Sequence, residues 1–168
     1  LTAFQFDQQK TNLRGLEITF DIHPHPLDWL HIENNFSFVR GTFQNPIEGC
    51  SNLPFIPAPK WFTECRADIK NVNTFLKNAY IKISLENTFS QNNFFSAYNT
   101  ETATPGYTLI NAGLGSEWVN KKNVQVLGIY FTASNISDVG YQSHLSRLKY
   151  ASPNLLTGRV GVFNVGRN

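Results

Sequence analysis

The segment from Tyr107 to Ser134 alternates apolar and polar residues on both sides of the polar tetrad Asn120-Lys121-Lys122-Asn123. The apolar residues share one parity in each arm: Ile110, Ala112, Leu114 and Trp118 before the tetrad, and Leu127, Ile129, Phe131 and Ala133 after it. A period of two predicts strands with one apolar and one polar face. The short Asn/Lys connection predicts an antiparallel hairpin. Its apolar face could meet a protein core or a lipid bilayer.

The same alternation recurs upstream and predicts an all-β chain. It is clear over residues 13–23, 30–44, 61–70 and 79–89, weaker over 3–8, and it starts again near residue 161. Residues 72–83 also fit a helical stripe, but their β-branched content and the period-two residues after them favour a strand. The sequence therefore predicts an antiparallel meander of about seven strands plus a truncated last strand.

Short and long connections alternate along the chain. The short ones lie at Pro24–Pro26, 71–77 and 120–123, and the long ones at 45–59, 90–106 and 135–159. In a meander, this order places all short turns at one end of the sheet and all long loops at the other. Strands of roughly ten residues with this asymmetry are typical of outer-membrane barrels. We therefore expect residues 1–168 to be one partial segment of a large transmembrane β-barrel.

The composition agrees with this interpretation. Charged residues make up 15% of the chain, against roughly 25% in soluble domains, while 14% of the residues are aromatic. Trp29, Trp61 and Trp118 fall near predicted strand ends, as in an interfacial aromatic girdle, although a buried core position stays open. A net charge of +2 without a dense Lys/Arg cluster argues against nucleic acid as a partner. No apolar run is long enough for a transmembrane helix.

Charged residues occupy the parity opposite the apolar one. In a barrel that face would meet a wet lumen or a plug, and in a soluble sandwich it would be the solvated surface. The predicted lumen-facing or plug-facing residues are Glu17, Asp21, Glu33, Glu64, Arg66, Asp68, Lys82, Glu86 and Glu117.

The long loops supply the candidates for ligand contact. Aromatic residues gather in one loop, and basic residues in another could attract an anionic ferric chelate or lipopolysaccharide. The candidates are Phe94, Phe95, Tyr98, His144, Arg147 and Lys149.

Catalytic and metal motifs are weak. Ser143 and His144 with Asp138 are triad residue types, but neighbouring side chains do not form that geometry from local sequence alone. His23 and His25 with Asp28 could bind a metal but lack a third spaced ligand, so turn chemistry is favoured. We expect no enzyme activity, no metal and no cofactor.

Two further residue types have structural interpretations. Glycines 113, 115 and 128 are expected to let bulky plug or lumen groups approach the strands. Cys50 and Cys65 have no metal spacing and are too few for a disulfide scaffold, so free thiols are favoured.

With the strands placed, several motifs resemble the C-terminal segments of TonB-dependent outer-membrane receptors, and most of all the Bacteroidetes-type members. There a Thr-Pro-Gly-Tyr segment enters a strand (here 104–107), an Asn-Leu-Phe-Asp-like motif ends a later one (135–138), a Tyr follows (Tyr141), and Gly-Arg-Asn starts the last strand (166–168). Upstream, RGLEITFDIHPHPLDWLHIENNFSFVRG resembles the family's Gly-x-Glu strand and the next strand, and LPFIPAP its Leu-Pro-x-x-Pro loop.

The resemblance implies a 22-stranded barrel with an N-terminal plug. Its implied function is uptake of a ferric siderophore or similar large nutrient across the outer membrane of a Gram-negative bacterium. Extracellular loops and plug would capture the ligand, and TonB would drive the plug rearrangement. We expect no plug domain and no TonB-binding segment in residues 1–168. The expected partners are therefore outer-membrane lipid and the barrel strands and plug of the rest of the receptor, with TonB acting through that other part. The alternatives are a small self-contained ligand-binding or adhesive β-barrel, or a soluble β-sandwich.

Overall fold

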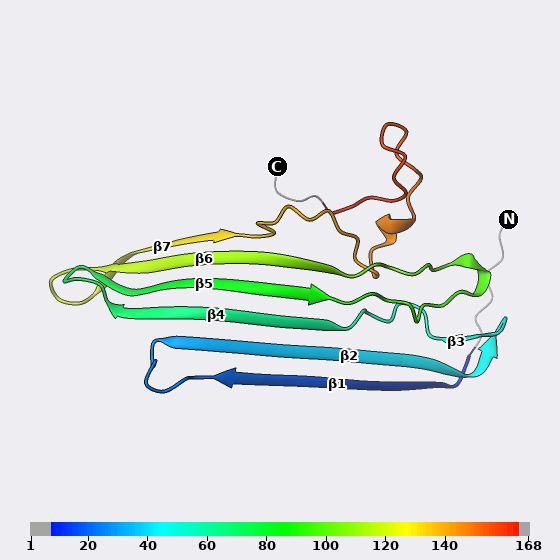
Figure 1. Ribbon diagram of the computed structural model, residues 1–168, viewed down its shortest axis with the longest axis horizontal. Helices are drawn as coiled ribbons and strands as arrows, with labels where there is room; N and C mark the ends of the chain where they lie inside the picture. Colours follow the sequence, from blue (N-terminus) through cyan, green and yellow to red (C-terminus); the bar gives the residue numbers. More distant parts are fainter. Residues whose placement is uncertain (1–7, 165–168) are drawn as a thin grey trace.

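The computed structural model describes residues 8–164, which form one seven-stranded antiparallel sheet (Figure 1). The spatial order is β1-β2-β4-β5-β6-β7, and β3 pairs with β2. The strands are β1 (Thr11–Ile22), β2 (Leu30–Ile47), β3 (Cys50–Asn52), β4 (Lys60–Asn71), β5 (Leu76–Thr88), β6 (Tyr107–Val119) and β7 (Gln125–Ala133). Two 3-10 turns, η1 (Ala97–Asn99) and η2 (Arg147–Tyr150), lie in the loops. The predicted all-β antiparallel meander is confirmed.

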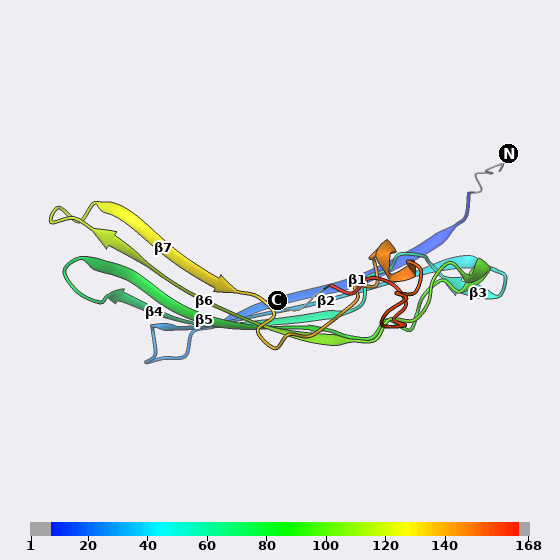
Figure 2. The ribbon, with the colours of Figure 1, turned by 90° about the horizontal axis from the view of Figure 1, so that it is seen from above.

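The sheet is a single long layer that bends along its length (Figure 2). The short turns lie together at one end, on the left in Figure 1, and the long loops lie at the other. Sheet edges are formed by β1 and β7, each of which pairs with one neighbour only. The sheet is therefore not closed within residues 8–164. In the same residues no helix has the length and apolar character needed to cross a membrane.

Asparagine side chains fix two of the short turns. In the turn after β6, Asn120 Oδ1 accepts hydrogen bonds from the backbone N–H groups of Lys122 at 2.8 Å and Val124 at 3.1 Å. Before β5, Asn73 Oδ1 accepts from the N–H groups of Phe75 at 2.8 Å and Leu76 at 2.7 Å. These side-chain hydrogen bonds satisfy backbone N–H groups at the turn, where the hydrogen bonds between the two strands end. The sharp chain reversals thus follow from the local sequence.

Some predicted boundaries change in the structure. The predicted strand over 3–8 lies outside the described residues except for Gln8, which is not in a strand. The seventh strand is instead β3, inside the segment 45–59 that was expected to be irregular. Residues 76–83 belong to a strand and not to a helix. Near the C-terminus, Asn164 forms an isolated antiparallel bridge with Tyr141.

The register makes the apolar parity continuous across the six long strands. One row of paired residues shows this directly: Ile22, Ile32, Cys65, Ile83, Ala112 and Ala133. No second sheet covers this face in residues 8–164, so Ile81 is 59% exposed and Phe131 63% exposed. The small buried apolar cluster lies in the loops instead, around Cys50, Phe95 and Ala97.

Candidate functional site

The three long loops pack together at one end of the sheet, and we call residues 48–59, 89–106 and 134–164 the loop cap. Glu101 joins the first two loops, because its Oε1 accepts a hydrogen bond from Phe55 N at 2.8 Å and its Oε2 accepts one from Phe95 N at 2.9 Å. Glu101 is only 3% exposed. A buried carboxylate needs such partners, because an unpaired buried charge is costly.

Lys149 joins the third loop to the second. Its Nζ donates to Thr102 O at 2.7 Å, Ala103 O at 2.9 Å and Thr104 Oγ1 at 2.6 Å. The three donors of the ammonium group are therefore all used. Burial lowers the pKa of Lys149, and the nearby Glu101 carboxylate partly offsets this. The loop cap thus contains a buried pair of opposite charges whose members also bond to backbone.

His144 lies between these two charged groups. Its Nδ1 is 2.7 Å from Thr104 Oγ1, and its Nε2 is 4.0 Å from Glu101 Oε2 without a hydrogen-bond partner. Burial lowers the pKa of His144, the Glu101 carboxylate raises it, and the Lys149 ammonium lowers it further, with a lowered pKa as the net result. The imidazole is therefore neutral at pH 7 and responds to acid.

The structure separates the six predicted ligand-contact residues into two groups. Phe95, His144 and Lys149 are buried and hold the loop cap together, so they do not present a free group to a ligand. Tyr98 and Arg147 are exposed, and Phe94 is half-buried. The predicted ligand contacts that remain accessible are therefore Phe94, Tyr98 and Arg147.

The sequence interpretation missed the buried polar residues that build the loop cap. Gln91, 3% exposed, donates through Nε2 to the carbonyl oxygens of Ile56 and Pro57 at 3.1 and 3.0 Å. Glu101 carried a usable signal, because it is the one charged residue in the segment 90–106. Cys50 is a buried free thiol, and Cys65 is also free. Burial alone would raise the pKa of Cys50, but its hydrogen bonds with Ser96 and Asn52 lower it overall.

The register places all nine predicted lumen-facing residues on the face opposite the apolar one. Several form ion pairs across neighbouring strands: Lys82 Nζ is 2.9 Å from Glu64 Oε2, and Lys60 Nζ is 3.5 Å from Glu86 Oε1. Glu117 accepts a hydrogen bond from Asn78 Nδ2 at 2.7 Å. The lumen itself stays a prediction, since the sheet is open.

Tyrosine rings cover one of the predicted glycines on this polar face. Tyr80 and Tyr130 stack with ring centroids 6.4 Å apart. A Cβ atom on Gly115 would come within 2.5 Å of Tyr130 Cδ1 and 2.7 Å of Tyr80 Cε1. Arg66 lies over the Tyr80 ring at 4.3 Å. The groups that approach Gly115 are therefore tyrosines of the neighbouring strands on the polar face, and the approach of a plug stays a prediction.

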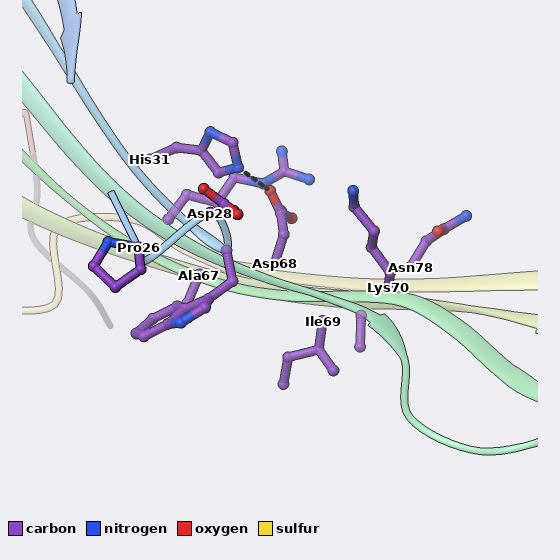
Figure 3. Close-up of a pocket in the computed structure, with 11 residues that line it drawn as sticks. Pro26, Asp28, His31, Ala67, Asp68, Ile69, Lys70 and Asn78 are labelled. Atoms are coloured by element: carbon purple, nitrogen blue, oxygen red, sulfur yellow. Dashed lines mark hydrogen bonds and ion pairs between the residues drawn. The ribbon is translucent and has the colours of Figure 1, made fainter. Parts of the chain in front are cut away.

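A groove of about 1080 Å³, lined by both polar and apolar side chains, lies at the short-turn end, beside the last residues of β4. Figure 3 shows His31 directed toward Asp68 across it, with Nε2 3.3 Å from Asp68 Oδ2. Asp68 also accepts a hydrogen bond from Arg66 Nε at 2.9 Å. His23 pairs with His31 and not with His25, which faces Asp28 at 3.8 Å. In residues 8–164, no three His, Cys, Asp or Glu side chains form a metal site.

The motifs that resemble the receptor family adopt defined local structures. Tyr107 begins β6, and a Cβ on the preceding Gly106 would lie 2.8 Å from Thr88 O, so only glycine fits there. Asn135 Oδ1 accepts from Val139 N at 3.1 Å and closes a turn just after β7. The rings of Tyr107 and Tyr141 pack with centroids 4.4 Å apart. The segments that contain Tyr107 and Tyr141 therefore meet in space, while the Gly-Arg-Asn motif at 166–168 lies outside the described residues.

No protein-family model matches the chain, and no curated protein is detectably similar to it in sequence.

Proposed function

We propose that this chain forms part of the wall and the extracellular loops of a TonB-dependent receptor. The receptor would take up a ferric siderophore or a similar large nutrient across the outer membrane of a Gram-negative bacterium. The observation that carries the proposal is the continuous, exposed apolar face of a one-layer meander whose long loops all lie at one end. Lipid is the environment that matches such a face, since burying each large apolar side chain stabilises by about 1.5–3 kcal/mol.

The tryptophans support a membrane of ordinary thickness. Trp61 on β4 pairs with Asn87 on β5, which in turn pairs with Thr108 on β6. Trp61 therefore lies level with Thr108, which is ten residues before Trp118 along β6. At about 3.3 Å per residue this is roughly 33 Å along the strands. A strand tilt of about 40° reduces it to roughly 25 Å in height, which is the apolar band of outer-membrane barrels.

The open edges also support a larger assembly. Within residues 8–164, β1 and β7 each present one unpaired backbone side, and within lipid each unpaired group costs several kcal/mol. A closed barrel that includes the missing strands would satisfy both edges. A small self-contained barrel would need β1 and β7 to pair with each other, either directly or through additional strands. A sandwich would need a second sheet over the apolar face, and residues 8–164 contain one sheet.

Depth-dependent fluorescence quenching tests the proposal. The chain is refolded into bilayers with bromine atoms placed at known depths on the acyl chains, and variants keep a single tryptophan. We expect Trp61 and Trp118 to be quenched most by bromine near the two interfaces, and a tryptophan placed at Ile83 to be quenched most near the bilayer centre. A monodisperse monomer in water without detergent, unquenched by lipid, would overturn the proposal.

A further inference from the structure

The polar face carries a second candidate site near the short turns, independent of the proposed transport function. His23 follows the last residue of β1 and His31 is the second residue of β2, so the turn between them brings the two rings together. Their Nδ1 atoms are 2.8 Å apart and the ring centroids 4.7 Å apart. Two ring nitrogens that face each other so closely share one proton or one cation.

The other nitrogen of His31 is already committed. Its Nε2 lies 3.3 Å from Asp68 Oδ2 (Figure 3). Asp68 is held in turn by Arg66 Nε at 2.9 Å. With Nε2 as the donor to Asp68, the Nδ1 of a neutral His31 is an acceptor aimed at His23. Metal-binding histidines are oriented in this way by a carboxylate behind the ring, and this contact fixes the tautomer.

The surrounding charges favour a cation. Asp21 and Glu33 are direct cross-strand partners, and each lies two residues from one of the histidines on the same face. Glu64 is the partner of Glu33 on the next strand. Arg66 opposes this field, but its guanidinium is paired with Asp68. Glu64 is itself paired with Lys82 Nζ at 2.9 Å. The acidic charge beside the histidines therefore comes from Asp21 on β1 and Glu33 on β2.

From this geometry we propose that His23 and His31 chelate one divalent transition-metal ion of borderline softness, such as Zn²⁺ or Cu²⁺, through their Nδ1 atoms. Two nitrogen ligands at about 2.0–2.1 Å in a tetrahedral site lie about 3.3 Å apart, so the rings need to separate by about 0.5 Å. No third protein ligand converges within residues 8–164. Water fills the remaining positions, which makes the bound ion exchangeable.

Copper electron paramagnetic resonance on the whole chain in detergent micelles tests the proposal, with zinc titration calorimetry for affinity. We expect one Cu²⁺ per chain with hyperfine coupling to two imidazole nitrogens, and Cu²⁺ binding tighter than Zn²⁺. His23→Ala and His31→Gln each reduce the coupling to at most one nitrogen and weaken Zn²⁺ binding at least tenfold. Asp68→Asn keeps both nitrogens but weakens binding by about 10–100-fold, because it removes the orienting carboxylate and the charge that pairs with Arg66.

His25→Ala is the matched control, because His25 lies in the same turn but faces Asp28. It should leave both the nitrogen count and the Zn²⁺ affinity unchanged. Circular dichroism confirms that each variant keeps its strand content. The proposal is overturned if His23→Ala binds Zn²⁺ as tightly as the unchanged chain, if His25→Ala removes binding, or if the copper spectrum shows no second nitrogen.

Discussion

The ammonium group of Lys149 lies 2.6 Å from the hydroxyl oxygen of Thr104, and this contact joins the second and third loops through two residues that are 45 apart in the sequence. Thr104 also contacts His144 Nδ1, so one hydroxyl group contacts both His144 and Lys149 of the third loop. Around it, Glu101 holds the first loop through the Phe55 amide. The loop cap is therefore a connected polar network, in which the loss of one member affects all three loops.

Replacing Lys149 with methionine should loosen this network. The change leaves two backbone carbonyls and a hydroxyl group without their donor, and each unsatisfied buried group costs about 1–3 kcal/mol. We expect hydrogen exchange of the Phe95 amide to accelerate on the order of tenfold or more, while amides in β4 and β5 keep their protection. Lys121→Met, in the exposed turn after β6, is the control and should change neither. Unaltered protection at Phe95 would show that Lys149 does not stabilise the loop cap.

Acid should loosen the loop cap through His144. Because burial lowers the pKa of His144 in the folded protein below its ordinary value of about 6.5, the unfolded chain takes up a proton first as the pH falls. Stability is therefore lost from about pH 7 downward, until the lowered folded-state pKa is reached. We expect the protection factors of the Phe55 and Phe95 amides to fall between pH 7.5 and 5.5. Each protection factor is calculated relative to the intrinsic exchange rate of that amide at the same pH.

His144→Gln removes the titrating group and should flatten this pH dependence. His25→Gln, which changes an exposed imidazole, should preserve it. An equally steep acid dependence in His144→Gln would assign the effect to another group.

The two faces of β7 should respond oppositely to a charge. Phe131 lies on the apolar face and Thr132 on the polar face, and both are exposed. If lipid covers the apolar face and residue 131 lies near the bilayer midplane, Phe131→Arg should cost roughly 2–4 kcal/mol of folding free energy in bilayers. Thr132→Arg should cost little folding free energy. Phe131→Leu removes the aromatic ring without adding a charge, so it distinguishes the effect of the charge from the effect of the lost ring volume. Guanidinium unfolding in lipid vesicles measures all three, and equal costs for the two arginine variants would contradict the lipid assignment.

Gly115→Ala should disturb the tyrosine pair above it. The added methyl group meets both Tyr80 and Tyr130, and displacing the rings should destabilise the sheet by roughly 1–3 kcal/mol. A part of this cost should disappear when Tyr130→Ala is present as well, with a coupling of about 0.5–3 kcal/mol. Gly140→Ala is the control, because nothing lies within 4 Å of its added Cβ. If the free-energy changes of Gly115→Ala and Tyr130→Ala simply add in the double variant, contact with the Tyr130 ring is not the reason that glycine is required at position 115.

The regular part of the fold could be predicted because it depends on neighbours in sequence. Alternation over 13–23 and 61–70 predicted β1 and β4 closely, since period two is a property of each strand alone. The asparagines at the turns act within four residues. β3 was missed because three residues are too few for a period and it forms only by pairing with β2.

The candidate sites were less predictable, because their contacts cross long loops. Phe95, His144 and Lys149 were identified by residue type and loop position, but burial reversed their expected role. No local pattern reveals that Glu101 bonds to Phe55, 46 residues away. The histidine pair was missed for the same reason: the sequence suggested His23 with His25, and the turn instead brings His31 to His23.

The sequence by itself determined where the six long strands lie, which face of each is apolar and at which end of the sheet the long loops lie. These follow from backbone pleating and turn chemistry, both of which act over a few residues. The tertiary structure decided how the strands align, and so made the separate apolar stripes into one uninterrupted face. It also decided which loop side chains are buried. Register and loop packing depend on pairings between distant segments, and these form only when the whole sheet is assembled.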